Sequence, residues 1–432
     1  MRQHRTFTIS NPFQYKGALL EWSRPFSKVV WLDSNAHVQK YSSFDFLMAV
    51  GEQTDKFSSI DSLNQLENQF AKNQDWLFGY LSYDLKNELE DLSSQNFDGL
   101  GFPMLQFFQP SKIIKCIGDT LHFMYLEDLV DDIEGDFAQV MALIDLEQKQ
   151  KEHHPIKIKM RIHKDAYFEK TNQLLGHIRR GDVYEANFCQ EFYAEEVSID
   201  PWETYQRLNA ISEPPFASFM RLDDKYLMCA SPERYLRKQG NTLISQPIKG
   251  TARRDKNESE DETLRHELAL DEKERAENIM ITDLVRNDLS KSALKGSVVV
   301  EELCEVYTYK QVHQLISTVV AQLPEGKNPV ELIEETFPMG SMTGAPKISA
   351  MKIIEELEET KRGLYSGAVG YFDPEGNFDF NVVIRSILYN ATRKYVSFSV
   401  GSAITAKSDP EREYQECLLK AKAMRSVLET GE

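Results

Sequence analysis

Residues 366–401, SGAVGYFDPEGNFDFNVVIRSILYNATRKYVSFSVG, contain the pattern that decides the fold class of this chain. Aromatic and β-branched residues dominate three runs, which predict strands near 366–372, 379–390 and 394–401. The proline and glycine of the DPEG segment favour a hairpin turn between the first two strands. Successive strands without a helix between them disfavour the regular βαβ alternation of a doubly wound parallel sheet, so an α+β fold is expected.

Helices and strands also mix irregularly from Ile156 up to this stretch, which favours the same fold class. Apolar residues at helical spacing predict helices at about 165–180, 259–285, from 346 onward and over 410–428. The first of these ends at Gly181, a residue type that is common just after a helix C-terminus. Further strands are expected near 216–221, 226–230, 242–248 and 297–302.

The first 140 residues alternate short apolar segments with polar turns, which indicates strands. These segments are Lys28–Leu32, Asp75–Tyr83, Lys112–Ile117 and Thr120–Tyr125. The polar, proline-terminated stretch DLEQKQKEHHP at 145–155 is typical of a connection between domains. We therefore expect an N-terminal domain over residues 1–150 and a C-terminal domain over residues 156–432.

The composition is that of a globular protein with an acidic surface. The 432 residues are 41% hydrophobic and 27% charged, and 50 Lys and Arg against 68 Asp and Glu leave a formal net charge of −18. Such a surface repels nucleic-acid backbones and anionic lipid, so neither a nucleic acid nor a membrane is an expected partner. A small anion would need a pocket in which a few Arg and Lys are concentrated.

Cysteine usage and the amino terminus favour the cytoplasm. The five cysteines are odd in number and form no CxxC pair, so neither a disulfide framework nor a zinc site is expected. The first residues, MRQHRTFTISNPF, do not have the apolar core of a secretory signal, and no run approaches the roughly 18 apolar residues of a membrane helix. We expect a cytoplasmic protein with reduced cysteines.

Two pairs of carboxylates lie at i, i+3 spacing on expected helices. Glu274 pairs with Glu277, and Glu413 pairs with Glu416, so each pair shares one helix face. Four oxygen ligands from two helices could hold Mg²⁺, which commonly takes one or two carboxylates together with water and an anionic substrate. The alternative is a solvated, charged helix face.

Two basic residues stand in positions that suit chemistry. Arg385 lies in NVVIRSILY, between Val383 and Ile387 on one face of an expected strand, so its guanidinium should point inward. It would need a partner there, either a ligand carboxylate or a structural Asp or Glu. Lys249 lies at a strand end in QPIKGTARR, before Gly250. In a dry pocket its pKa would fall and its amine would become a nucleophile, whereas in a turn it would be an ordinary solvated lysine.

Four further residues could take part in the same site. Glu233 in SPERY follows a strand, where a partly buried carboxyl could transfer a proton or be an ordinary turn carboxylate. Arg286 lies at a helix end and could face an anion, and Lys347 lies in the first turn of a helix whose amide donors attract anions. His313 in QVHQLIS has apolar surroundings, which are also typical of a satisfied core histidine.

The order and spacing of eight motifs resemble the chorismate-utilising enzymes, which include the large subunits of anthranilate synthase and aminodeoxychorismate synthase and, as cousins, the isochorismate and salicylate synthases. The motifs are GDVYEANFCQ, SPERY, PIKGTARR, ERAENIMITDLVRNDL, GSMTGAPK, YSGAVGYF, NVVIRS and SDPEREYQECLLKA, within about residues 160–428. The segments ALLEW, YSSFDFL and DWLFGYLSYDL resemble the N-terminal domain of the same subunits more loosely. The resemblance implies large mixed or antiparallel sheets in a sandwich-like core flanked by helices.

Within this family, the residue after PI is informative. Anthranilate synthases typically read PIAGT and aminodeoxychorismate synthases read PIKGT, and this chain has Lys249 there. The resemblance therefore implies that chorismate and ammonia are converted to 4-amino-4-deoxychorismate, on the route to p-aminobenzoate and folate. Lys249 would add at C2 of the ring as the C4 hydroxyl leaves, and ammonia would then add at C4 as the lysine is expelled. Glu233 would be the acid or base at the departing oxygen.

The resemblance also implies a metal and several substrate contacts. Glu277 and Glu416 match the Mg²⁺ ligands, with Glu274 and Glu413 holding metal-bound water. The other residues carried over are Arg385 and Tyr365 at the enolpyruvyl carboxylate, His313 near the ring, and Ser341 and Gly401 as further carboxylate contacts.

The nitrogen source, the alternative functions and one departure from the family pattern complete the expectations from the sequence. No cysteine lies in a GxCxG setting, so glutamine is expected to be used only through a separate glutaminase subunit. The alternatives to the amination at C4 are an anthranilate synthase large subunit and a non-catalytic chorismate-binding relative. Glu185 stands where these synthases usually have Gln and where isochorismate synthases have a general-base Lys, which argues against water as the nucleophile.

Overall fold

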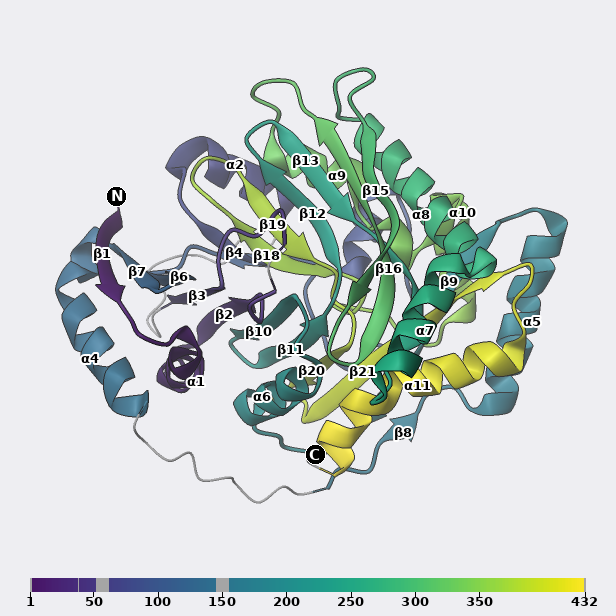
Figure 1. Cartoon of the computed structure of the whole chain (residues 1–432), viewed down its shortest axis with the longest axis horizontal. Coiled ribbons are helices and arrows are strands. Elements are labelled where there is room, and N and C mark those ends of the chain that lie inside the picture. Colours follow the sequence, from purple (N-terminus) through teal and green to yellow (C-terminus); the bar gives the residue numbers. More distant parts are fainter. Residues whose placement is uncertain (1, 38, 52–61, 145–154, 431–432) are drawn as a thin grey trace.

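Two large sheets lie face to face with helices outside them in the computed structural model of this chain (Figure 1). The structure describes residues 2–37, 39–51, 62–144 and 155–430. Neighbouring strands within both sheets of these residues run antiparallel. The expected α+β class, with a sandwich-like core, is therefore confirmed.

The larger sheet has 12 strands within the described residues. In spatial order they are β1 (Arg2–Thr8), β7 (Thr120–Leu126), β6 (Lys112–Ile117), β3 (Phe46–Gly51), β2 (Lys28–Asp33), β10 (Phe216–Leu222), β11 (Lys225–Ser231), β20 (Ser386–Asn390), β21 (Tyr395–Thr405), β9 (Glu185–Ala194) and β17 (Gly344–Ala345). The short β8 (Lys159–Met160) pairs with β9.

The smaller sheet has nine strands within the same residues. In spatial order they are β14 (Ile248–Arg253), β16 (Val312–Gln322), β13 (Thr242–Gln246), β12 (Arg234–Gln239), β19 (Phe378–Asn381), β18 (Ala368–Phe372), β4 (Leu77–Leu81) and β5 (Leu105–Phe108). The long β15 (Val299–Thr308) pairs with β16.

Both sheets combine strands from the two ends of the chain. In the larger sheet β2 pairs with β10, and in the smaller sheet β4 pairs with β18. The connection expected at 145–155 lies, except for its last residue, outside the described residues. The division into a domain over 1–150 and a domain over 156–432 therefore stays a prediction.

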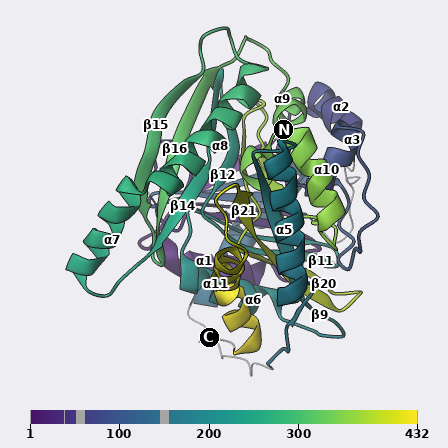
Figure 2. The same ribbon diagram turned by 90° about the vertical axis from the view of Figure 1, so that its right-hand side faces the viewer.

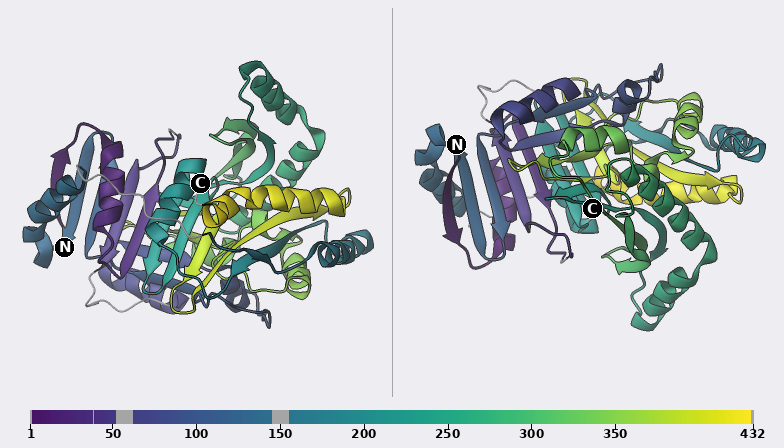
Figure 3. Two further views of the ribbon diagram at one scale, coloured as in Figure 1. Left: turned by 90° about the horizontal axis from the view of Figure 1, so that it is seen from below. Right: turned by 90° about the horizontal axis from the view of Figure 1, so that it is seen from above.

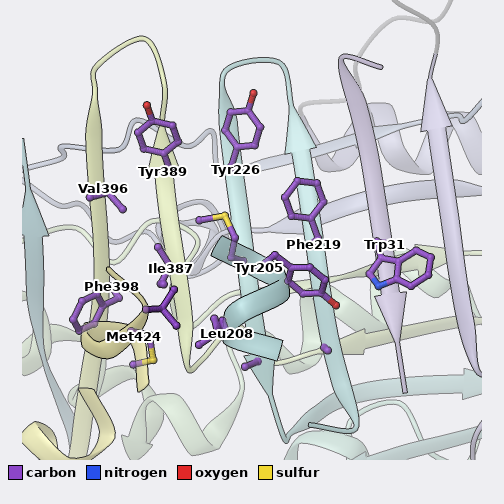
Figure 4. Close-up of a cluster of buried hydrophobic side chains, with 14 of the residues drawn as sticks. Trp31, Tyr205, Leu208, Phe219, Tyr226, Ile387, Tyr389, Val396, Phe398 and Met424 are labelled. Atoms are coloured by element: carbon purple, nitrogen blue, oxygen red, sulfur yellow. The ribbon is translucent and has the colours of Figure 1, made fainter. Parts of the chain in front are cut away.

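Strand β2 shows why the central strands read as continuous apolar runs. All six of its residues are buried. Successive side chains of a strand point to opposite faces, so Val29 and Trp31 join one hydrophobic cluster while Val30 and Leu32 join another with residues of the smaller sheet. Figure 4 shows the first cluster, in which Tyr205, a residue of a helix outside the sheet, packs against Phe219 of β10.

Helices cover the outer face of the larger sheet and one side of the smaller sheet. The first hydrophobic cluster includes residues of α1 (Pro12–Trp22), α4 (Ile133–Ile144), α5 (Lys164–Arg180), α6 (Pro201–Ser212), α10 (Lys347–Leu357) and α11 (Pro410–Glu429). The helices α7 (Glu258–Leu270) and α8 (Glu272–Ser290) lie along β14, β15 and β16 (Figure 2). The remaining elements are α2 (Leu63–Asn73), α3 (Lys86–Leu89), α9 (Pro329–Thr336) and the short 3₁₀ turns η1 (Tyr83–Leu85), η2 (Glu127–Asp132) and η3 (Gly340–Met342).

Helix α7 differs from the other long helices because it projects from the body of the protein (Figure 3). Leu268 is its one buried residue and packs with Cys304 and Leu315 in a small separate cluster. Among the described residues, no helix combines the length and the apolar character needed to cross a membrane.

Two expected elements are each divided in the structure. The helix expected over 259–285 is two helices, because Asp271 ends α7 and its side chain accepts a hydrogen bond from the backbone N–H of Glu274 at the start of α8. The strand expected over 379–390 is wrong: β19 belongs to the smaller sheet and β20 to the larger, and the chain crosses between them.

Candidate active site

The site lies where the chain passes from one sheet to the other. One crossing joins β11 to β12 through Glu233, and the other joins β19 to β20 through Arg385. The crossings are adjacent, since the N–H of Val382 donates to the carbonyl of Glu233 at 3.0 Å and the N–H of Ala230 donates to that of Arg385 at 3.1 Å. Glu233 and Arg385, which are 152 positions apart in the sequence, thus lie in two adjacent crossings between the sheets.

Glu233 is a buried carboxyl with a single hydroxyl partner. It is 4% exposed, and Ser341 in η3 donates a hydrogen bond to its Oε1 at 2.6 Å. Burial raises the pKa of Glu233 to about 7, although the Ser341 hydroxyl and the ammonium of Lys249 act in the opposite direction. A carboxyl with this pKa can either give or take a proton near neutral pH, and the role of Glu233 in proton transfer stays a prediction.

Lys249 lies in β14, and the glycine after it allows the strand to bend. Gly250 has φ +95°, and a Cβ there would lie 2.8 Å from Cδ1 of Leu315. The Nζ of Lys249 lies 3.1 Å from Oε1 of Glu185, with 13% of the lysine side chain exposed. The partly buried lysine is therefore held against a carboxylate in a strand, which disagrees with a solvated turn.

The expected fall in the pKa of Lys249 is wrong. Burial does lower the pKa, but the carboxylates of Glu185 and Glu277 favour the ammonium and raise the pKa above its usual value. The expectation supposed a dry pocket, and the sequence does not show that acidic residues from β9 and α8 face the lysine. In this state the lysine carries a proton.

Asn278 couples the first acidic pair to the lysine strand. Its side-chain amide donates to the carbonyl of Lys249 at 3.1 Å and to that of Leu315 at 3.0 Å. Because Asn278 follows Glu277 directly, this contact sets the distance between α8 and the lysine. Burial raises the pKa of Glu277 to about 7, with Glu274 adding to the rise and Lys249 opposing it.

The second acidic pair lies on α11. Glu413 is 4% exposed. Glu416 is exposed and forms an ion pair with Lys420, with 2.6 Å between Oε1 and Nζ. Although partial burial would raise it, the pKa of Glu416 is lowered by Lys420 and, more weakly, by Lys249. Both pairs thus interact electrostatically with the same lysine.

The carboxylates suit Mg²⁺ in chemistry but not yet in spacing. Oxygen ligands are those that Mg²⁺ prefers, and a cation would stabilise the charged form of Glu277, whose pKa is raised mainly by burial. Within the described residues, however, no group of three or more His, Cys, Asp or Glu side chains is close enough to hold a metal ion. The two pairs would have to approach each other to share one ion.

Arg385 has a half-buried guanidinium available for a ligand. The sequence predicts Arg385 within a strand, and this prediction is wrong. The residue lies in the crossing between the sheets, with φ +51°. Its guanidinium has no hydrogen bond or ion pair with another described residue, and burial lowers its pKa. It lines a cavity together with Ala230, Pro232 and Gln314. An anionic group entering this cavity would supply the missing partner.

Tyr365 and Gly401 are placed against β9. Tyr365 is 4% exposed, accepts a hydrogen bond from the thiol of Cys189 at 3.8 Å and interacts electrostatically with Arg385. A Cβ on Gly401 would lie 2.4 Å from the Cys189 sulfur, so close packing of β21 on β9 already requires glycine there. The carbonyl of Gly401 accepts from Lys420 at 2.9 Å.

Three of the expected residues are engaged elsewhere. His313 contacts Thr308 through Nδ1 at 2.9 Å and Asp261 through Nε2 at 3.1 Å, so both ring nitrogens have partners. Arg286 is exposed and pairs with Asp283 at 2.6 Å, and Lys347 pairs with Asp288 at 2.6 Å. The structure does not bring these side chains into contact with Lys249 or Glu233.

A buried ion pair that the sequence analysis missed supports the site. Arg362 pairs with Glu358 at 2.7 Å, and it donates to the carbonyls of Met342 and Asn187, each at 2.7 Å. It thereby fixes the turn that carries Ser341 against β9. Removing one partner would leave a buried unpaired charge and would destabilise the fold by about 3–5 kcal/mol. The i, i+4 spacing of the two residues was the available signal.

Comparison with known proteins identifies the family. The pattern of the chorismate binding enzymes matches residues 17–426. The chain belongs to this family. An anthranilate synthase component I-like protein of Synechocystis is 37% identical over 356 residues, which cover 82% of this chain and 72% of that relative. Aminodeoxychorismate synthase component 1 of Bacillus subtilis is 32% identical over 378 residues, which cover 85% of this chain and 80% of the relative.

A solved structure shows the same fold. Anthranilate synthase component I from Streptococcus pneumoniae aligns over 98% of this chain and 92% of that protein, with a TM-score of 0.75. At 24% identity this likeness concerns the fold alone. With the family match, the chain is a chorismate-utilising enzyme whose relatives include two kinds of synthase.

Proposed function

We propose that this chain is the chorismate-converting component of an aminodeoxychorismate synthase, which forms 4-amino-4-deoxychorismate from chorismate and ammonia. The observation that carries the proposal is the placement of Lys249, whose partly buried amine lies 3.1 Å from Oε1 of Glu185. It also interacts electrostatically with Glu233. A lysine held beside a carboxyl of raised pKa suits a nucleophile paired with an acid or base.

The residues of the site have distinct parts in this reaction. Arg385 binds the enolpyruvyl carboxylate, because its guanidinium lacks a partner among the described residues. Lys249 gives a proton to the Glu185 carboxylate 3.1 Å away, and its neutral amine then adds at C2. Glu233, with a pKa of about 7, holds the proton that the departing C4 hydroxyl takes. If the two acidic pairs approach each other, Glu277 and Glu416 would hold Mg²⁺, which would neutralise and orient the ring carboxylate.

Ammonia would reach the site from a separate glutaminase subunit. The relative from Bacillus subtilis is named component 1, which implies a second component in that enzyme. The present sequence has no cysteine in a GxCxG setting. The purified chain should therefore use ammonium salts but not glutamine.

Anthranilate synthase component I is the second candidate, because the Synechocystis relative is 37% identical and bears a related name. The deciding experiment is incubation of the purified chain with chorismate, Mg²⁺ and ammonium, with products identified by mass and ultraviolet spectrum. We expect 4-amino-4-deoxychorismate. Anthranilate as the main product would favour the second candidate, and no conversion would indicate a binding protein.

A further inference from the structure

Lys249 lies in a β-bulge. The register of β14 on β16 shifts between Ile248 and Thr251. Over this shift two residues of β14, Lys249 and Gly250, face one residue of β16, Leu315. A bulge bends its strand and changes the direction of a side chain, and bulges are frequent next to active sites. This bulge bends β14 at the lysine of the proposed reaction.

One side chain pairs with the backbone on both sides of the bulge. The amide nitrogen of Asn278 donates to the carbonyl of Lys249 at 3.1 Å and to that of Leu315 at 3.0 Å. The first carbonyl belongs to the bulged strand and the second to the residue opposite the bulge. A bulge disrupts the ladder locally, and a buried carbonyl without a donor is costly. Because Asn278 is 1% exposed, its amide supplies these donors inside the protein.

The oxygen of the same amide also has partners, and they fix its orientation. Ser317 of β16 donates to Oδ1 at 2.5 Å and Thr282 of α8 donates to it at 3.3 Å, while the thiol of Cys304 in β15 lies 3.5 Å away. With these donors on the oxygen, the nitrogen must face the two carbonyls. Asn278 therefore joins α8 to β14, β15 and β16 in a single orientation, along the side on which this helix lies (Figure 2).

We propose that Asn278 is a positioning residue for the nucleophile: its two hydrogen bonds set the shape of the bulge and thereby keep Nζ of Lys249 beside Glu185 and in line with C2 of chorismate. The inference rests on the proposed function and assigns the residue that orients its covalent step.

The effect of Asn278 should fall on that step alone. The neutral amine of Lys249 bonds to C2, the double bonds of the ring shift, and the C4 oxygen leaves with the proton of Glu233 as water. A displacement on the order of 1 Å can slow such a step about a hundredfold. Chorismate itself would be held by Arg385 and the metal, which are separate from the bulge. We therefore expect slower adduct formation at a similar affinity for chorismate.

Two variants and a control isolate the donors of the amide. Asn278→Asp keeps the size and the acceptor but has no donor, and Asn278→Leu has nearly the same shape without donor or charge. Thr282→Val is the matched control, since Thr282 lies one turn further along α8, is 2% exposed and contacts only the oxygen of the Asn278 amide and the Asn278 carbonyl. Its loss leaves both contacts to the bulge.

The first experiment follows formation of the lysine adduct. Each protein is mixed with Mg²⁺ and a series of chorismate concentrations without ammonium, and adduct on the Lys249 peptide is timed by mass spectrometry. In both Asn278 variants the rate should fall at least about tenfold, while the chorismate concentration for half-maximal rate changes less than about threefold. Thr282→Val should stay within about twofold of the unaltered protein in both quantities. Circular dichroism checks folding, and Asn278→Asp keeps the test valid if Asn278→Leu does not fold.

A second measurement needs no chorismate. Acetylation of Lys249 by acetic anhydride at fixed pH reports how much of its amine is neutral. Glu185 favours the ammonium, so an amine displaced from Glu185 should react at least about threefold faster in Asn278→Leu. The exposed Lys422 is the internal reference and should react at an unchanged rate.

The other outcomes overturn the inference. Unchanged adduct formation in both Asn278 variants would show that the bulge keeps its shape without the amide. An equal fall in Thr282→Val, or a loss of chorismate affinity as large as the loss of rate, would show that Asn278 only stabilises the packing of α8. Absence of adduct in the unaltered protein would refute the proposed function itself, whereas the acetylation of Lys249 would still report the position of the amine.

Discussion

Replacing Ser341 by alanine should move the pH dependence of the enzyme upward. The Ser341 hydroxyl donates to Oε1 of Glu233 at 2.6 Å and lowers the pKa of a carboxyl that burial has raised to about 7. A hydrogen bond to an ionised group contributes about 1.5–3 kcal/mol, and 1.36 kcal/mol corresponds to one pH unit, so its loss raises the pKa of Glu233 by about one unit or more.

The sign follows from the part that Glu233 takes. The protonated carboxyl is the form that can protonate the departing C4 hydroxyl, so activity falls as pH rises through the pKa of Glu233. In Ser341→Ala this fall should occur about one pH unit or more higher than in the unaltered protein.

The assay is kcat/KM for chorismate between pH 5.5 and 9, because this ratio reports groups of the free enzyme. Ser341→Thr, which retains a hydroxyl, is the matched control and should keep the original profile. A lower rate at every pH with an unshifted midpoint would show only that Ser341 positions substrate. A downward shift in Ser341→Ala would refute the assignment of Glu233 as the acid.

Three further predictions concern the same site. In Lys249→Ala, the rate of 4-amino-4-deoxychorismate formation should fall at least about a hundredfold. Chorismate affinity should fall much less, since Arg385 remains. Product formation at the original rate would show that Lys249 is not the nucleophile and contributes only its charge. Glu277→Gln and Glu416→Gln should each raise the Mg²⁺ concentration needed for activity at least about tenfold, with circular dichroism as the check on folding, and unchanged activity at limiting Mg²⁺ would exclude that residue from the metal site. The pKa of Glu233 is about 7 in the folded chain and 4.5 without the fold, so its ionisation should lower the free energy of unfolding as pH rises between these values, by on the order of 3 kcal/mol. Urea titrations of Glu233→Gln should show a smaller decrease in the free energy of unfolding over this pH range.

Local signals in the sequence predicted many of the elements. The helix expected at 165–180 is α5, and Gly181 ends it with φ +85°, as its residue type indicated. The four expected N-terminal strands correspond to β2, β4, β6 and β7. Each of these depends on periodicity and a terminating residue within one segment, which a sequence displays directly.

Other elements were missed or misread because their limits depend on partners. Strand β9, which carries Glu185, and strand β16, which pairs with the strand of Lys249, were not expected, since helical and strand patterns overlap in such apolar runs. The run 379–390 has continuous strand character, yet it pairs with β12 at one end and with β11 at the other. Only pairing across distant segments decides where such a run breaks.

The sequence by itself determined which residue types are available: a lysine before a glycine, an acid after a strand, two acidic pairs and an arginine in an apolar run. Tertiary structure decided what each of them can do. It placed Glu185 against Lys249, 64 positions away in the sequence, and left the Arg385 guanidinium without a partner among the described residues. It also placed the Ser341 hydroxyl at hydrogen-bond distance from Glu233, whereas His313 and Lys347 pair with other residues. The reason is physical, because a pKa or a free hydrogen-bonding group depends on burial and on neighbouring charges, and these come from strands that meet only in the folded chain.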